Sequence, residues 1–233
     1  MSDATDKVAG ISHIPLFPLP LVLLPNELLP LHIFEPRYKQ MLKDIELKRN
    51  IFGISFHDTE KSLGEKPEIG SIGCVAEVRE TQTMPDERSN IVTSGLIRYK
   101  LLEYAEIDSP YFVGSVEFFE DDPEPDEDSL RSAADDVYDL FDRIAKAAFK
   151  LSGNRGRFPE IPHSDPEPLS FLVTAAFNLD NEIKYQMLAM TSTLERLNKL
   201  RDILVQAVDQ MEESAEINAL AQTNGHSDKK IDL

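Results

Sequence analysis

Residues 14–41 read IPLFPLPLVLLPNELLPLHIFEPRYKQM, and this stretch decides the fold at the start of the chain. Its first part, residues 14–34, is strongly apolar but is interrupted by Pro15, Pro18, Pro20, Pro25 and Pro30. A proline inside a helix removes a backbone hydrogen bond and clashes with the preceding turn, so these residues cannot form a membrane-spanning helix. The stretch therefore predicts short strands and turns.

The end of the same stretch predicts one short helix over residues 36–47. Pro36 suits the first helical position, because its fixed φ fits the helix and its missing N–H would have no partner there. The apolar residues that follow recur at helical spacing: Tyr38, Met41, Leu42 and Ile45.

Further along, the chain reads as strands separated by turns. The β-rich runs are residues 51–56, 72–78, 91–93, 96–104 and 111–119. In the second run, small or apolar side chains stand at every other position, Ile72, Cys74, Ala76 and Val78, while Glu77 and the following Arg79 point the other way. Turn signals stand between the runs at Pro67, Gly70, residues 84–90 and the pair Ser109-Pro110. Several short strands at this spacing predict an antiparallel barrel or sandwich.

An acidic segment, EDDPEPDED at residues 120–128, then marks a change in composition. Its seven carboxylates and two prolines predict a solvated linker. A calcium-binding loop is the alternative, but the segment lacks the central glycine and the terminal glutamate of that pattern.

After the linker the apolar period becomes helical. One stripe comprises Leu130, Ala134, Val137, Phe141, Ile144, Ala148 and Leu151. A second helix is predicted to open at Asp165-Pro166 and a third at Asp180 or Asn181. Ser192, with Glu195 three residues later, forms a capping-box pattern for a last helix over residues 193–214. The stripe on that helix favours packing against a core or groove over a coiled-coil seam, because the helix is short.

Composition narrows the class of protein. The 233 residues include 24 Lys and Arg against 42 Asp and Glu, a formal net charge of −18, which disfavours binding to nucleic acid. With Cys74 as its one cysteine, the chain cannot form an intramolecular disulfide, and this residue is expected to be a small buried side chain. The first ten residues resemble neither a secretory signal nor a transit peptide. We expect a soluble, cytoplasmic protein without membrane association.

The sequence offers no recognisable catalytic centre. It has no G-x-x-x-x-G-K-[ST] loop for nucleotide phosphates, and its five histidines are scattered without metal-ligand spacing. Residues 53–57, GISFH, begin like a nucleophile elbow but end in histidine where glycine is required. We therefore predict that the protein is not an enzyme and that it uses no cofactor and no metal.

The stretch LFPLP followed by LPLHIFEPRY closely resembles the opening of the LON domain, the substrate-recognition module at the N-terminus of Lon-type ATP-dependent proteases. Later segments agree with it: GSIGCVAEV at residues 70–78, GLIRY at 95–99 and the closing helices at 178–204. The resemblance spans about residues 11–212. The Asp-Gly hairpin turn usual in the family is replaced here by residues 84–90, which predicts a longer hairpin.

The resemblance implies an α+β fold, a PUA-like β pseudo-barrel followed by a helical bundle. The expected organisation is a flexible N-terminus at 1–12, a β-rich subdomain at 13–119, the acidic linker at 120–128, a helical subdomain at 129–214 and a disordered tail at 215–233. In the full protease an ATPase and a Ser–Lys peptidase follow this domain. The given sequence ends before either, so the resemblance implies recognition without cleavage.

Phe34, Arg37 and Tyr38 are the candidate peptide-binding residues, lining a groove for extended chains. The competing interpretation is structural: Pro30, Leu31, Ile33 and Phe34 close the barrel, while Glu35 and Arg37 form a local ion pair. A client, meaning an unfolded polypeptide bound by the protein, would bury its apolar side chains on an exposed apolar patch. The acidic surface would favour clients with basic residues on either side of the apolar segment.

The leading functional hypothesis is a non-catalytic module that binds unfolded or damaged polypeptides and delivers them to a separate ATP-dependent protease. The alternative is a scaffold or assembly subunit that binds one folded partner protein. Nucleic-acid binding is suggested only by the PUA-like fold and is opposed by the charge. The client, the partner and the oligomeric state stay open at this point.

Overall fold

The computed structural model describes residues 3–58, 66–152 and 163–224, and residues 225–233 of the expected tail lie outside them. The chain divides into two compact units. One comprises Met1–Pro123 with Thr174–Thr191 and is called the barrel unit below. The other comprises Glu124–Val173 with Ser192–Leu233 and is called the helical unit. Among the described helices, none is long and apolar enough to span a bilayer.

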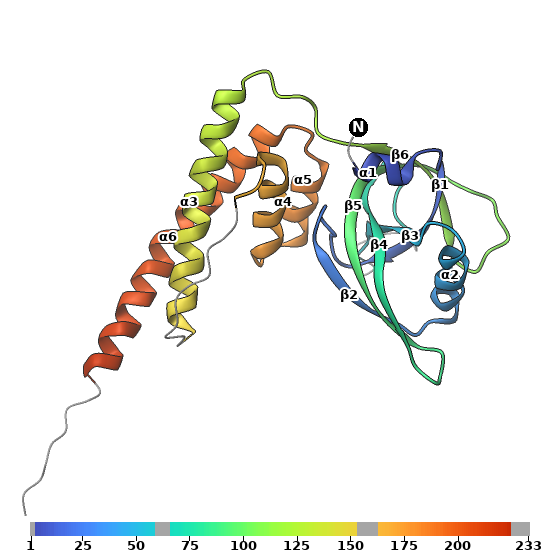
Figure 1. Ribbon diagram of the computed structural model, residues 1–233, viewed down its shortest axis with the longest axis horizontal. Helices are drawn as coiled ribbons and strands as arrows, with labels where there is room; N and C mark the ends of the chain where they lie inside the picture. Colours follow the sequence, from blue (N-terminus) through green and yellow to red (C-terminus); the bar gives the residue numbers. More distant parts are fainter. Residues whose placement is uncertain (1–2, 59–65, 153–162, 225–233) are drawn as a thin grey trace, which may run out of the picture. The chain divides into compact units, whose positions relative to one another are not determined.

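The described strands of the barrel unit form one sheet that closes on itself (Figure 1). Their order is β2-β5-β4-β3-β1-β6, and β5 also pairs with β6. The strands are β1 (His13–Leu19), β2 (Leu28–Ile33), β3 (Ile51–Phe56), β4 (Ile72–Thr83), β5 (Ser89–Tyr104) and β6 (Phe112–Phe119). The expected combination of a β pseudo-barrel with helices, an α+β fold, is confirmed.

The long strand β5 closes the barrel. Residues 89–94 of β5 pair with β2, and residues 98–104 pair with β6, while β4 pairs along both parts. The sequence predicts two separate runs, 91–93 and 96–104, but they form one strand. Gly95 interrupts the β-rich pattern of the sequence but does not end the strand. A glycine stands here because the chain from Leu24 to Glu27 crosses over this position.

That crossing belongs to the opening stretch. The amide of Asn26 donates to the carbonyl of Gly95 at 2.9 Å, and the amide of Gly95 donates to the carbonyl of Glu27 at 2.9 Å. Asn26 has a φ of 65°, a conformation that asparagine tolerates better than most residues. A Cβ on Gly95 would lie 2.0 Å from the carbonyl oxygen of Leu24, so only glycine fits without movement of the backbone.

The barrel interior is filled around Tyr99 of β5. Its ring lies over Gly73, where an added Cβ would be 2.4 Å from the ring, and its hydroxyl shares a hydrogen bond of 2.7 Å with Ser55. Leu16, Val75 and Leu101 belong to the same core. Glycine on the neighbouring strand thus makes room for a large aromatic ring.

The N-terminus is partly structured, which differs from the flexible segment expected at 1–12. Residues Asp3–Val8 form helix α1, and Val8 is buried in the barrel core. Lys7 donates a hydrogen bond of 3.1 Å to Glu77 on β4. Two apolar residues, Ala4 and Val8, in a short polar segment give too little periodicity to predict such docking.

Helix α5 (Asn181–Ala189) is grouped with the barrel unit, although the sequence places it in a helical subdomain at 129–214. The guanidinium of Arg98 on β5 holds it there by donating to the carbonyls of Leu188 and Met190, the first at 3.2 Å. Tyr185 of α5 also accepts a hydrogen bond of 2.9 Å from the amide of Ile72.

Arg98 is itself almost completely buried, with its side chain 1% exposed. It forms an ion pair with Asp121, whose side chain is 6% exposed, and its guanidinium lies 4.6 Å from the centre of the Phe119 ring. A buried cation is tolerated only when it is paired and hydrogen-bonded, and both conditions are met here.

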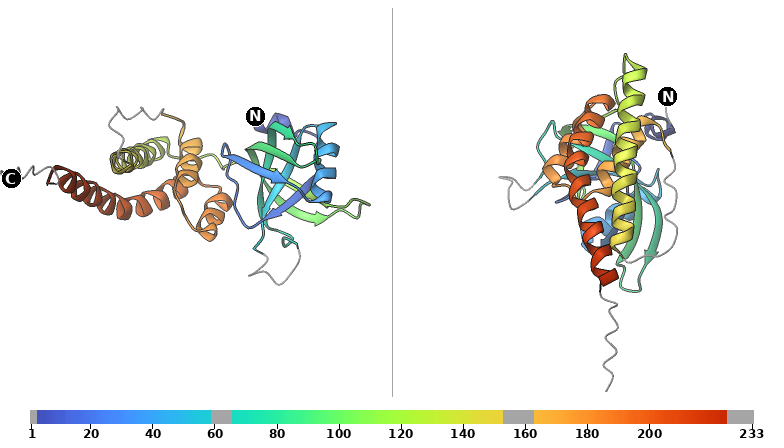
Figure 2. Two further views of the ribbon diagram at one scale, coloured as in Figure 1. Left: turned by 90° about the horizontal axis from the view of Figure 1, so that it is seen from below. Right: turned by 90° about the vertical axis from the view of Figure 1, so that its left-hand side faces the viewer.

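The helical unit contains α3 (Glu127–Leu151), residues 166–173 of α4 (Pro166–Ala176) and α6 (Thr193–Asn224). Helices α3 and α6 run alongside each other (Figures 1 and 2). Helix α6 continues past Ser214, where the sequence predicts its end. A second buried arginine, Arg196, donates to the hydroxyl of Ser170 at 2.7 Å and lies over the ring of Phe171 at 4.0 Å.

The acidic segment at 120–128 is not simply a solvated linker, because several of its carboxylates have structural partners. Asp121 pairs with Arg98. Glu124 accepts from the amide of Leu194 at 2.9 Å at the start of α6. Asp126 caps α3 by accepting from the amide of Ser129 at 3.1 Å. Carboxylates favour helix N-termini, where backbone N–H groups lack partners.

Candidate functional site

The candidate site lies where β2 pairs with β5, next to the hairpin that β5 forms with β4. The hairpin turns over residues 84–88, where the amide of Met84 donates to the carbonyl of Arg88 at 2.8 Å. Thr83 and Ser89 are cross-strand partners at its base, so Asn90 belongs to β5 and not to the turn. The residues of β4 from Arg79 to Thr83 are exposed.

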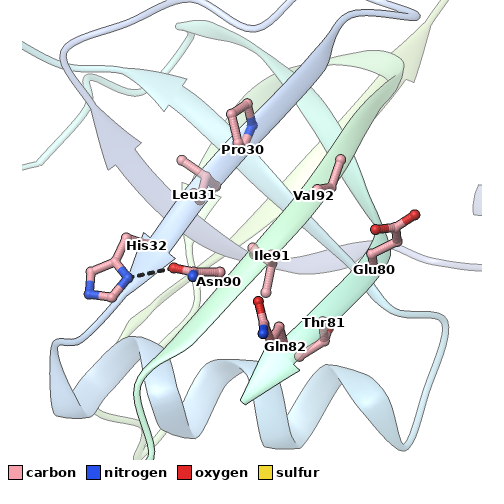
Figure 3. A pocket seen from close by; sticks show the side chains of 9 residues that line it. All are labelled: Pro30, Leu31, His32, Glu80, Thr81, Gln82, Asn90, Ile91 and Val92. Atoms are coloured by element: carbon pink, nitrogen blue, oxygen red, sulfur yellow. Dashed lines mark hydrogen bonds between the residues drawn. The ribbon is translucent and has the colours of Figure 1, made fainter. Parts of the chain in front are cut away.

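A groove of about 380 Å³ runs across these three strands (Figure 3). Its lining residues are Pro30, Leu31, His32, Glu80, Thr81, Gln82, Asn90, Ile91 and Val92. The strand registers arrange six of them in two cross-strand rows. One row is Pro30–Val92–Glu80 and the other is His32–Asn90–Gln82.

The two rows differ in chemistry. The first offers the apolar surfaces of Pro30 and Val92 beside the carboxylate of Glu80. In the second, His32 Nδ1 and Asn90 Oδ1 are hydrogen-bonded at 2.7 Å. Asn90 and Gln82 carry amide groups, which can donate to and accept from a peptide backbone. The groove can therefore accommodate an apolar side chain while its amides bond to the main chain beside it.

Phe34 follows β2 directly and extends this surface. Its side chain is 58% exposed, and its ring stacks on His32 with centroids 5.9 Å apart. At the other end of β2, Leu28 is 66% exposed. Two large apolar side chains thus stand exposed at the two ends of the strand that forms one wall of the groove.

Arg37 lies at the first turn of α2 (Pro36–Glu46) and is held by its neighbours. Its guanidinium forms a 2.8 Å ion pair with Glu35 and lies 4.7 Å from the centre of the Tyr38 ring. Both members of the pair are partly exposed, so the pair contributes at most about 1 kcal/mol to stability. The local ion pair of the competing interpretation is therefore present.

Tyr38 occupies a different environment, because its side chain is buried in the barrel unit. Its ring packs against Phe17 with centroids 3.9 Å apart, and the residue is 4% exposed. Burial raises the pKa of its hydroxyl above the ordinary value, and the nearby Arg37 guanidinium partly opposes this rise. Of the three candidate residues, Phe34 and Arg37 are exposed to solvent, whereas Tyr38 is part of the core.

Alanine substitutions should separate these roles. Tyr38→Ala removes a buried aromatic ring and should lower the free energy of unfolding by about 3–5 kcal/mol. Phe34→Ala removes an exposed ring and should change it by less than about 0.5 kcal/mol. Urea denaturation of both variants checks the contrast, and equal losses of stability would show that Phe34 is also a core residue.

Sequence reasoning missed the polar side of the groove, which is formed by Glu80, Gln82 and Asn90. A signal was available, since ETQT at residues 80–83 and SNIV at 89–92 continue the period-two pattern on both sides of the turn. Assigning residues 84–90 as one loop separated Asn90 from the strand that places it opposite His32.

The described residues form no group of three or more side chains placed to hold a metal ion. Cys74 is buried, and burial raises the pKa of its thiol to about 12, so it is not a ready nucleophile. The groove itself is lined by apolar side chains together with amide, carboxylate, imidazole and hydroxyl groups.

The fold and the groove thus define a class: an α+β protein whose barrel unit carries an exposed groove. Comparison with known proteins gives the family. The model of the ATP-dependent protease La (LON) substrate-binding domain matches residues 13–206. The chain belongs to this LON substrate-binding domain family, which defines a substrate-recognition module.

Curated relatives are Lon proteases. That of Anaeromyxobacter dehalogenans is 27% identical over 207 residues, covering 82% of this chain and 24% of the relative. That of Koribacter versatilis is 21% identical over 205 residues, covering 88% of this chain and 25% of the relative. The chain therefore spans about a quarter of the length of these two relatives.

Solved structures agree on the fold. The Lon N-terminal domain protein from Xanthomonas campestris has a TM-score of 0.56 at 18% identity, covering 82% of this chain and 97% of that one. The N-terminal domain of the Mycobacterium avium complex Lon protease has a TM-score of 0.61 at 17% identity, covering 83% and 98%.

Proposed function

We propose that this protein binds unfolded or damaged polypeptide segments without catalysing a reaction and delivers them to a separate ATP-dependent protease. The observation that carries the proposal is the groove across β2, β5 and β4, with exposed Phe34 beside it. Membership of the substrate-binding family supports the same role. The proposed setting is the cytoplasm, and no cofactor is needed for binding.

The chemistry of an unfolded chain matches this surface. Such a chain exposes apolar side chains together with unpaired backbone N–H and C=O groups, which folded proteins bury. Phe34, Pro30 and Val92 can cover an apolar side chain, and the amides of Asn90 and Gln82 can bond to its backbone. One surface would therefore contact both the apolar side chains and the unpaired backbone groups that distinguish an unfolded segment.

Strand β2 favours recognition through side chains over addition of a new strand. Among the described strands it pairs only with β5, so a second partner could in principle add to its other edge. Pro30 lies in the middle of β2 and has no N–H to donate, which weakens any added ladder. Contacts with the groove should therefore provide most of the affinity.

Phe34, Arg37 and Tyr38 keep distinct places in this proposal. Phe34 is the apolar contact residue. Arg37 stands at the rim, where its ion pair with Glu35 limits its freedom to bond a client carboxylate. Tyr38 supports the Arg37 guanidinium and the start of α2 and makes no direct contact with the client.

Phe34→Ala should weaken binding of a reduced, alkylated and fluorescently labelled polypeptide about tenfold, since truncating a central aromatic contact commonly costs more than 1 kcal/mol. Fluorescence anisotropy titration measures this loss. Leu47→Ala is the matched control, because Leu47 is also apolar and is 89% exposed, but follows the end of α2. Equal affinities of the two variants would place the client elsewhere on the protein.

A further inference from the structure

The groove contains one formally charged side chain, that of Glu80. Among its nine lining residues, Glu80 is the one Asp, Glu, Lys or Arg. Glu80 is exposed on β4 and forms no ion pair with any described residue. Its cross-strand neighbour is Val92, so the free negative charge lies directly beside the apolar row of the groove.

The basic side chains around the hairpin leave this charge unneutralised, because each has another partner. Arg79 pairs with Glu77 at 2.9 Å, and Arg88 pairs with Asp86 at the turn. On α2, Lys39 donates to the carbonyl of Asp86 at 3.2 Å, and Lys43 pairs with Glu87 at 3.6 Å. A ligand cation would therefore meet Glu80 without displacing a cation of the protein.

The length of the row Pro30–Val92–Glu80 determines how far apart an apolar and a basic side chain must lie in a bound peptide. Neighbouring strands lie about 4.8 Å apart, so the row Pro30–Val92–Glu80 spans about 10 Å, the length of about three extended residues. A peptide that places an apolar side chain over Pro30 and Val92 would bring a residue two or three positions away to the Glu80 carboxylate.

We propose that Glu80 makes the groove selective for unfolded segments in which lysine or arginine lies two or three residues from a large apolar side chain. This inference rests on the proposed function and adds the class of segment that the site prefers. The partner is identified by its charge and spacing, and the formal net charge of −18 favours its approach.

Two labelled peptides test the inference, identical except that one carries lysine and the other glutamate two residues after a phenylalanine. The wild-type protein should bind the lysine peptide about threefold more tightly at low salt, as expected for one exposed ion pair. The preference should shrink at about 0.5 M salt, where screening reaches only a few ångströms.

Glu80→Gln should bring the ratio of the two affinities well below the wild-type value, toward equal binding of the two peptides. Glu46→Gln is the matched control, since Glu46 is exposed and lines the groove on the other face of the hairpin, and its loss removes the same charge. The inference is overturned if Glu80→Gln keeps the wild-type ratio, or if Glu46→Gln loses it as well. Failure of the wild-type protein to bind either peptide would overturn the proposed function together with the inference.

Discussion

Arg98→Met is expected to lower the free energy of unfolding of the barrel unit by about 4 kcal/mol. Removing one member of a buried ion pair leaves the other charge buried without a partner, which commonly costs about 3–5 kcal/mol. Here the substitution removes the ion pair between Arg98 and the buried Asp121 carboxylate and takes a donor from the carbonyls of Leu188 and Met190. Urea denaturation measures the loss.

An exposed pair provides the control. Arg88 and Asp86 form the same kind of ion pair on the hairpin, but their side chains are 48% and 52% exposed. Arg88→Met should therefore cost no more than about 1 kcal/mol. Hydrogen exchange gives a second readout, since the amides of α5 should lose protection in Arg98→Met. A loss as small as that of Arg88→Met would show that Arg98 does not hold α5 to the barrel.

Gly95→Ala is the second substitution with a large expected effect. Its Cβ would lie 2.0 Å from the carbonyl oxygen of Leu24 and 2.9 Å from the carbonyl carbon. Both atoms are backbone, so the crossing segment must move and its two hydrogen bonds with Gly95 must distort. We expect a loss of about 3 kcal/mol or more, at the upper end for overpacked cores.

Gly114→Ala provides a comparison, since it adds the same methyl group at a position where the nearest atoms belong to flexible side chains. Its Cβ would lie 2.6 Å from Cδ1 of Leu101 and 2.8 Å from Cδ1 of Leu16, both ends of flexible side chains. A loss of about 1 kcal/mol is expected, as for mild overpacking. If thermal and urea denaturation rank the two variants in the opposite order, the crossing of the chain over Gly95 is not a fixed feature.

Local patterns in the sequence predicted most individual elements. Strand β3 has the predicted bounds, and helix α5 begins at Asn181, one of the two predicted positions, although the Asp180 side chain makes no capping hydrogen bond. The Ser192–Glu195 pattern marks the start of α6, where the Ser192 hydroxyl accepts from the amide of Glu195 at 3.1 Å. Such capping depends on residues three positions apart, which a sequence displays directly.

Contacts between distant residues could not be predicted in the same way. Arg98 meets Leu188, Met190 and Asp121 only after the chain has folded, so neither the place of α5 nor the role of Asp121 is visible locally. In residues 120–128, composition indicates solvation, while Asp121, Glu124 and Asp126 have specific partners. A count of charged residues does not distinguish carboxylates that are exposed to solvent from those that have specific partners.

The candidate site was predicted in part. The opening stretch pointed to Phe34 and Arg37, both of which present surface, and to Tyr38, which does not. Helical spacing alone assigns Tyr38 to the buried face of α2 together with Met41 and Ile45, and the structure follows that spacing. The polar side of the groove depends on the register of β4 with β5, which the turn at 84–88 determines, and on the pairing of β2 with β5, which joins residues far apart in the chain.

Binding to one protein in two states tests the central claim most directly. The purified protein should be titrated, without nucleotide, against a reduced and alkylated polypeptide that stays unfolded and against the same polypeptide in its native form. The account predicts measurable binding to the unfolded form and none to the native form. Equal binding to both forms, or binding to neither, would contradict recognition of unfolded chains and favour a scaffold for one folded partner.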